Sequence, residues 1–77
     1  MPSTSDEIVS RMAVALRYAR AVLRAEFREN ASCLVVGGQN ATRGKTLDQI
    51  MEMVEPGERV YVRRLYNAAK RADEALQ

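Results

Sequence analysis

Apolar residues recur at steps of three and four along the first part of the chain, which is the spacing of one α-helical face. The face consists of Ile8, Met12, Leu16, Ala19, Leu23 and Phe27. Thr4 and Glu7 stand three residues apart ahead of this face, as the two members of a helix capping box do. The pattern predicts a long amphipathic helix that begins near residue 4.

The end of this first helix is marked less sharply than its start. The apolar face continues through residues 31–35, but several residues there are poor helix formers. Gly37 is a firm stop, because glycine readily takes the left-handed conformation that ends helices. We favour a single helix that reaches Gly37. The alternative is a helix that ends near Asn30 and is followed by a short extended segment at residues 34–36.

A polar stretch and a short helix follow. Residues 39–45 have no apolar period and contain a glycine, so they are predicted to form a loop. Thr46 and Gln49 then have the spacing of a second capping box. Pro56 ends this helix, because proline disfavours helical geometry at the residue before it. The apolar face of the short helix consists of Leu47, Ile50, Met51 and Val54.

A third helix is predicted to begin after Gly57 and to run to the C-terminus. Its apolar positions alternate between steps of three and four, as one buried helical face requires, and they are Val62, Leu65, Ala69, Ala72 and Leu76. A chain of 77 residues is too short to form two independent cores. The sequence therefore predicts one all-α domain over residues 1–77, built as a helical hairpin or three-helix unit with a glycine-rich loop.

The predicted core is thin. Alanine occupies much of the apolar surface of both long helices, which allows close backbone approach but contributes little buried area per residue. A chain of this size buries only about 60–65% of the surface that its unfolded form exposes. One cysteine and no histidine leave neither an internal disulfide nor a histidine metal site to compensate. We therefore expect a homo-oligomer that associates through its alanine- and leucine-rich faces.

The composition lacks most of the side chains that perform catalysis. The chain has no histidine, no tryptophan and one cysteine, Cys33, whereas metal sites and acid-base or nucleophilic catalysis draw largely on histidine and cysteine. We expect no enzyme, no metal site and no cofactor, and a Cys33 that is packed like a small apolar residue. No apolar run approaches a membrane span and the start has no basic signal region, so we expect a cytoplasmic protein without a membrane partner.

The net charge of +2 is distributed unevenly along the chain. The first helix carries a row of arginines at steps of three and four, which repel one another weakly: Arg17, Arg20, Arg24 and Arg28. A partner outside the helix is therefore expected. One candidate is the acidic set of the second helix, in the same chain or a symmetry mate, namely Asp48, Glu52, Glu55 and Glu58. The other is a phosphate-bearing or acidic molecule.

The loop before the short helix ends in Gly44, Lys45 and Thr46, as a nucleotide-binding phosphate loop does. The leading glycine is displaced by one position, and the chain is too short for the parallel sheet that such a loop requires. An NTPase is therefore excluded. A weaker anion site remains open, in which Arg43, Lys45 and Thr46 hold a phosphate at the start of the short helix.

The third helix combines arginines with tyrosine, a mixture that suits phosphate contacts and base stacking. The basic residues are Arg59, Arg63, Arg64, Lys70 and Arg71, with Tyr61 and Tyr66 between them. The alternative is that Tyr61 lies in the core and the arginines are solvated. The low net charge also weakens a nucleic-acid interpretation.

The leading interpretation is a small non-enzymatic binding protein of a bacterial or phage type. It would act as a regulator or inhibitor by occupying a partner macromolecule, most simply a protein. Its partner contacts would include Arg17, Arg20, Arg24, Arg28, Arg59, Arg63, Arg64 and Tyr66. One alternative is an oligomer that sequesters a phosphate or nucleotide ligand with the loop residues Arg43, Lys45 and Thr46. The other is nucleic-acid binding through the third helix.

Overall fold

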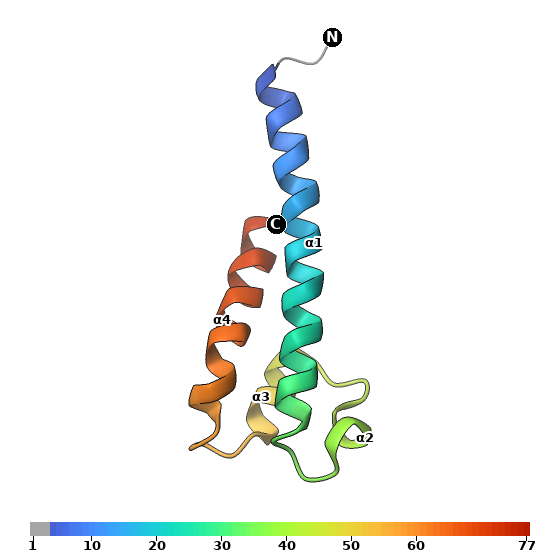
Figure 1. The fold of residues 1–77 in the computed structure, drawn as a ribbon, viewed down its shortest axis with the longest axis vertical. Coiled ribbons are helices and arrows are strands. Elements are labelled where there is room, and N and C mark those ends of the chain that lie inside the picture. Colours follow the sequence, from blue (N-terminus) through green and yellow to red (C-terminus); the bar gives the residue numbers. More distant parts are fainter. Residues whose placement is uncertain (1–3) are drawn as a thin grey trace.

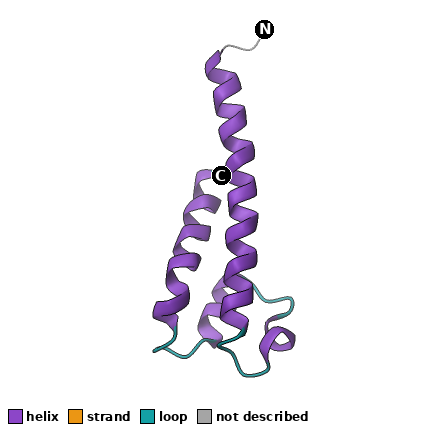
Figure 2. Cartoon of the chain, viewed as in Figure 1, coloured by secondary structure: helices purple, strands orange, loops and turns teal. Residues whose placement is uncertain are grey.

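The computed structural model describes residues 4–77, except for the side chain of Thr4. Figures 1 and 2 show a long helix with a shorter antiparallel helix beside it and two small helices at one end. The helices of the described residues are α1 (Thr4–Ser32), α2 (Gly38–Thr42), α3 (Leu47–Met53) and α4 (Arg59–Ala75), and these residues form no strand. The prediction of an all-α helical unit is confirmed.

The favoured prediction of a helix that reaches Gly37 is wrong, whereas the alternative end near Asn30 is correct to within two residues. The helix stops at Ser32, and residues 33–37 form turns that are neither helical nor extended. The amide of Leu34 donates to the carbonyl of Ala31 at 2.9 Å, which tightens the chain directly after the helix. Gly37 has a φ of 95°, and a Cβ there would lie 2.9 Å from Cβ of Ala41. Poor helix formers thus end α1 early, and only glycine fits the turn that follows.

The helix α2 was predicted as loop. It is a single polar turn that has no apolar face to reveal it in the sequence. Its last residue, Thr42, is buried, and the hydroxyls of Thr42 and Ser32 lie 2.7 Å apart in a hydrogen bond that joins α2 to the end of α1. This short helix therefore depends on a contact between segments rather than on its own sequence pattern.

The predictions for α3 and α4 are confirmed. The Gln49 amide donates to the Thr46 hydroxyl at 3.1 Å, and the Thr46 amide donates to the Gln49 side-chain oxygen at 2.8 Å, which completes the capping box. The backbone becomes extended at Val54, two residues before Pro56. The predicted capping box of Thr4 involves a side chain that lies outside the described part of the chain.

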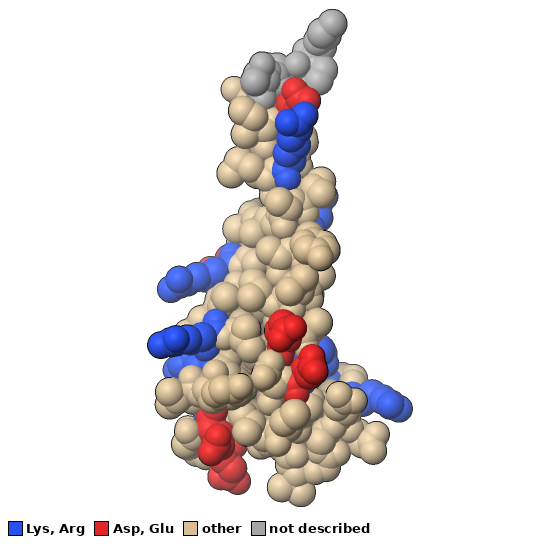
Figure 3. Space-filling view, viewed as in Figure 1, with Lys and Arg blue, Asp and Glu red and all other residues tan. Residues whose placement is uncertain are grey.

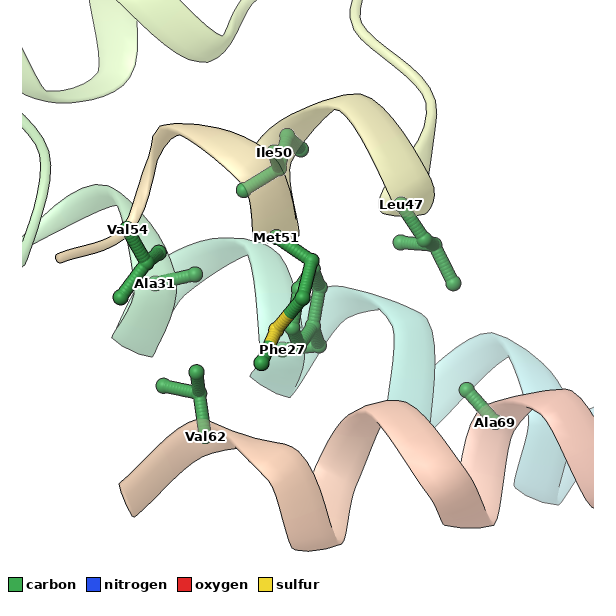
Figure 4. Packing of buried hydrophobic residues seen from close by; sticks show 8 residues of the cluster. All are labelled: Phe27, Ala31, Leu47, Ile50, Met51, Val54, Val62 and Ala69. Atoms are coloured by element: carbon green, nitrogen blue, oxygen red, sulfur yellow. The ribbon is translucent and has the colours of Figure 1, made fainter. Parts of the chain in front are cut away.

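The hydrophobic core lies at one end of the molecule. Figure 4 shows residues of three helices converging on the last turns of α1, where Phe27 is completely buried. The Phe27 ring also contacts the ring of Tyr66, with 5.9 Å between the centroids. The core consists of Phe27, Ala31, Leu47, Ile50, Met51, Val54, Val62 and Ala69. This cluster holds α3 and α4 against α1.

The other end of α1 projects beyond the rest of the molecule. Arg20 Nη1 lies 3.0 Å from Asp73 Oδ1, and α4 ends at Ala75. Since two antiparallel helices rise by equal steps, the last residue, Gln77, lies level with about residue 16 of α1. Residues 4–15, the projecting segment, therefore have no helix beside them (Figure 1). The Cα radius of gyration is accordingly 15.4 Å, where a compact domain of this length has about 11–12 Å.

Several side chains that the sequence analysis predicted to be buried are exposed. Ile8 and Met12, the first residues of the predicted apolar face of α1, are 51% and 65% exposed because no helix covers them. Tyr61 is 66% exposed, so the alternative prediction that it lies in the core is wrong. Cys33 is exposed as well. Among the described helices, none is both long and apolar enough to cross a membrane.

Removing the Phe27 ring tests the position of the core. Because this side chain is fully buried between three helices, we expect Phe27→Ala to lower the free energy of unfolding by about 3–5 kcal/mol. Urea denaturation followed by circular dichroism measures this loss. The control Val36→Ala alters a side chain that is 97% exposed and leaves the unfolding midpoint unchanged. Equal effects of the two substitutions would contradict this placement of the core.

Candidate functional site

The arginine row of α1 divides between structural and free positions. Arg20 pairs with Asp73 of α4 at 3.0 Å, and Arg28 Nη2 donates to the carbonyl of Lys45 at 2.7 Å. Arg17 and Arg24 are exposed and form no hydrogen bond or ion pair with other described residues. Among the described residues, the row pairs with Asp73 and not with the acidic set of α3 and the following turn that the sequence suggested.

Two of the predicted contact residues of α4 stabilise the fold. Arg59 Nε donates to the carbonyl of Val54 at 2.9 Å and its Nη2 donates to that of Glu52 at 3.1 Å, which closes the turn between α3 and α4. Tyr66 is half-buried against Phe27. Arg63 and Arg64 point outward and are exposed. Figure 3 shows basic groups extending from the side of the molecule where α4 lies.

A polar cluster joins α3 to α4. The Tyr66 hydroxyl and the Lys70 ammonium both donate to the Asp48 carboxylate, the latter at 3.0 Å. The hydrogen bond from Tyr66, followed by that from Lys70, lowers the pKa of Asp48 below 3.8. In turn, the bonds to Asp48 raise the pKa of Tyr66 above 10.0 and the pKa of Lys70 above 10.5. The cluster thus adds polar contacts between α3 and α4 at the surface.

The three loop residues predicted to hold an anion do not converge. The Thr46 hydroxyl accepts the amide of Gln49 as a helix cap. Lys45 borders a hollow of about 290 Å³ that it shares with the acidic Asp48 and Glu52. Arg43 lies elsewhere, on a hollow of about 320 Å³ between α1 and α2 that Arg28 also lines. The structure thus brings Arg43 together with Arg28 of the helix row.

An exposed apolar row, which we call the outer face, runs along α1. Val14, Tyr18 and Val22 follow one another at steps of four and are 63%, 74% and 43% exposed. The row continues through Ala25 to the hollow between α1 and α2. The sequence analysis missed this face, although its spacing is regular, because the longer apolar face that contains Phe27 dominates the same helix.

A second exposed apolar surface lies beside the projecting segment, and we call it the end groove. It is an open hollow of about 630 Å³, lined by residues of α1 from Val9 to Ala19 and by Ala75 and Leu76 at the end of α4. The end groove is the continuation of the α1 face that α4 covers further along. In Figure 3 the surface beyond the end of α4 is mainly uncharged, apart from a charged patch near the tip.

The described residues contain no group of three or more histidine, cysteine, aspartate or glutamate side chains placed to hold a metal ion. The exposed surface of this part of the chain includes two apolar faces on α1 and several arginines. Such surfaces recognise other molecules by burial of apolar area and by charge.

The Asp48 cluster makes stability depend on pH. A carboxylate whose pKa is lowered in the folded state stabilises it above the unfolded pKa near 3.8, and this contribution is lost as the pH falls through the folded value. We therefore expect Asp48→Asn to lower the Tm near neutral pH, with a difference from wild type that shrinks in acid. Thermal melts across the acid range measure it. The control Glu55→Gln alters an exposed carboxylate outside this cluster; a Tm difference for Asp48→Asn that stayed constant with pH would contradict the expectation.

Comparison with known proteins identifies no relative of the chain. No protein-family model matches the chain, and no curated protein and no solved structure shows significant similarity to it. The surfaces of α1 and the placement of the arginines are therefore what bears on function.

Proposed function

We propose that the protein is a small non-enzymatic binding protein that acts as a regulator or inhibitor by occupying a partner macromolecule. The partner is a protein with an apolar groove, and the outer face of α1 enters that groove. The observation that carries the proposal is the row of Val14, Tyr18 and Val22, three large side chains exposed on one side of a helix.

The spacing of these residues is that of a helix that binds in a groove. Anchors at steps of three and four align along one side of a helix and enter a partner's groove together. Full burial of a valine contributes about 1.5–3 kcal/mol, and a tyrosine adds a large rigid surface with a polar hydroxyl at its tip. A contiguous row of large apolar side chains is uncommon on the solvent side of a monomeric domain, because its contact with water is unfavourable.

The arginines indicate the charge of the partner. By helical spacing, Arg17, Arg24 and Arg28 lie on the side of α1 next to the outer face. Arg43 approaches the same end of the row through the hollow between α1 and α2. A partner groove with an acidic rim would pair with these cations, speed the encounter and fix the direction of the helix in the groove.

The two alternative functions, phosphate binding and nucleic-acid binding, depend on side chains that partly take part in contacts within the fold. A phosphate ligand would be held by Arg43, Lys45 and Thr46, but the Thr46 hydroxyl already accepts the Gln49 amide. A nucleic acid would contact Arg63 and Arg64, while Tyr66 is engaged by Phe27 and Asp48. Both alternatives remain predictions, and neither uses the exposed apolar row.

A substitution pair tests the proposed surface. Tyr18 and Val60 are matched, since they are 74% and 76% exposed and lie on different helices. We expect nuclease-treated cell extract to yield one protein that is retained by wild type and by Val60→Glu and is lost with Tyr18→Glu. We expect the purified partner to bind Tyr18→Glu at least about 100-fold more weakly than wild type, which corresponds to about 2.8 kcal/mol.

The binding titration with the purified partner decides the outcome. Retention of the same proteins by all three forms would overturn the proposal, because binding would then be independent of the outer face. Retention that occurs only when nuclease treatment is omitted would instead indicate nucleic-acid binding, whose affinity falls steeply with salt. Circular dichroism of each variant confirms that the helices are intact.

A further inference from the structure

The end groove of α1 is shaped for a helix. It continues the surface on which α4 lies, and it begins where Ala75 and Leu76 end that helix. The projecting segment is about 18 Å long. An occupant that prolongs the path of α4 is therefore a helix of about three turns that runs antiparallel to α1, with its N-terminus against the end of α4.

We propose that the occupant is the projecting segment of a second copy of the chain, paired antiparallel with the first. Each segment then fills the end groove of the other, and the two copies form a C2 dimer with an isologous interface. This pairing is independent of the outer face, which carries the proposed function.

The geometry selects the antiparallel arrangement. In a parallel pair, the second α1 would continue past residue 16 into the space that α4 already occupies (Figure 1). In the antiparallel pair, each segment instead begins at the end of the partner copy's α4 and follows the groove to the tip. Small side chains at Ala13 and Ala15 allow the two backbones to approach closely.

One cation remains available at the inner end of the groove. Glu7 pairs with Arg11 of its own helix at 2.9 Å, and Arg20 pairs with Asp73. Arg17 adjoins the groove, and antiparallel pairing brings the first turn of the other copy's α1, which carries Asp6, towards it. A helical side chain also covers the turn before its own Cα, so Arg17 reaches towards the incoming N-terminal turn. Its guanidinium has no partner among the described residues of its own chain.

The exposed area is sufficient for a stable dimer. The chain exposes 5860 Å², whereas a compact monomer of this mass exposes about 4,700 Å². This excess of about 1,200 Å² per copy is larger than the roughly 800 Å² per partner that a specific interface of standard size buries. Val9 and Met12, near the centre of the segment, are 63% and 65% exposed in the single chain and supply large apolar side chains to the pair.

The first test uses two substitutions on the same helix. Met12 lies in the end groove and Val14 on the outer face, and their exposures are 65% and 63%. Sedimentation velocity is expected to give a dimer for wild type and for Val14→Glu. Met12→Glu places a charge in the apolar contact of both copies and is expected to raise the dimer Kd by about 100-fold or more.

These variants keep the dimer and the proposed function apart. Met12→Glu is expected to retain the protein partner as a monomer, whereas Val14→Glu loses that partner and stays a dimer. A monomeric wild type at high micromolar concentration overturns the pairing, as does a dimer that Met12→Glu leaves intact. Circular dichroism shows whether each variant keeps its helices, which both exposed positions are expected to permit.

Disulfide trapping then tests the direction of the pair. In a Cys33→Ser background, Val9→Cys places a thiol near the two-fold axis, where the residue faces its own copy. Two copies of Ala19→Cys lie about 28 Å apart in the antiparallel pair, beyond the roughly 7 Å between Cα atoms that a disulfide spans. Cross-linking of Val9→Cys alone is the expected result. Cross-linking at both positions indicates a parallel pair and overturns the proposal, and so does cross-linking at neither.

Discussion

The burial of Phe27 is the contact on which the remaining structure depends. Its ring lies between α3 and α4 and leaves no exposed surface. The core residues of α3 close one side of it, and Val62 and Tyr66 of α4 close another. Because helices as short as α3 are not stable alone in water, they persist through contacts of this kind. The single phenylalanine of the chain thus fixes the end of α1 at which the fold is assembled.

This placement of the core explains the elongated shape. All large buried side chains gather at the C-terminal end of α1, and further along α4 contributes mainly alanines to its contact with α1. Ala69 and Ala72 are buried, but each removes little apolar area from water. The ion pair of Arg20 with Asp73 lies near the end of this contact, and its partly exposed position limits its strength. The stability of the hairpin therefore decreases from the core towards the end groove.

Local patterns in the sequence were enough to place three of the helices. The capping box of Thr46 and Gln49, the break at Pro56 and the apolar steps of α4 each depend on neighbouring residues, so they are readable without a structure. Contacts between segments that are distant in the sequence could not be predicted from such patterns. The hydroxyl pair of Ser32 and Thr42, which holds α2, and the bond of Arg20 to Asp73, 53 residues away, follow from tertiary packing. The uncovered half of α1 likewise follows from the register between α1 and α4.

The outer face and the end groove lie on nearly opposite sides of one rigid helix, which has a consequence for binding strength. A pair of chains joined as proposed through the end groove would present two outer faces at a fixed separation, directed away from the pair. Such a particle would be bivalent. A target with two matching grooves at that separation would be bound with an avidity about 10²–10⁴-fold above the single-site affinity. A target with one groove would gain nothing. The spacing of the two faces would then select among partners whose individual grooves are identical.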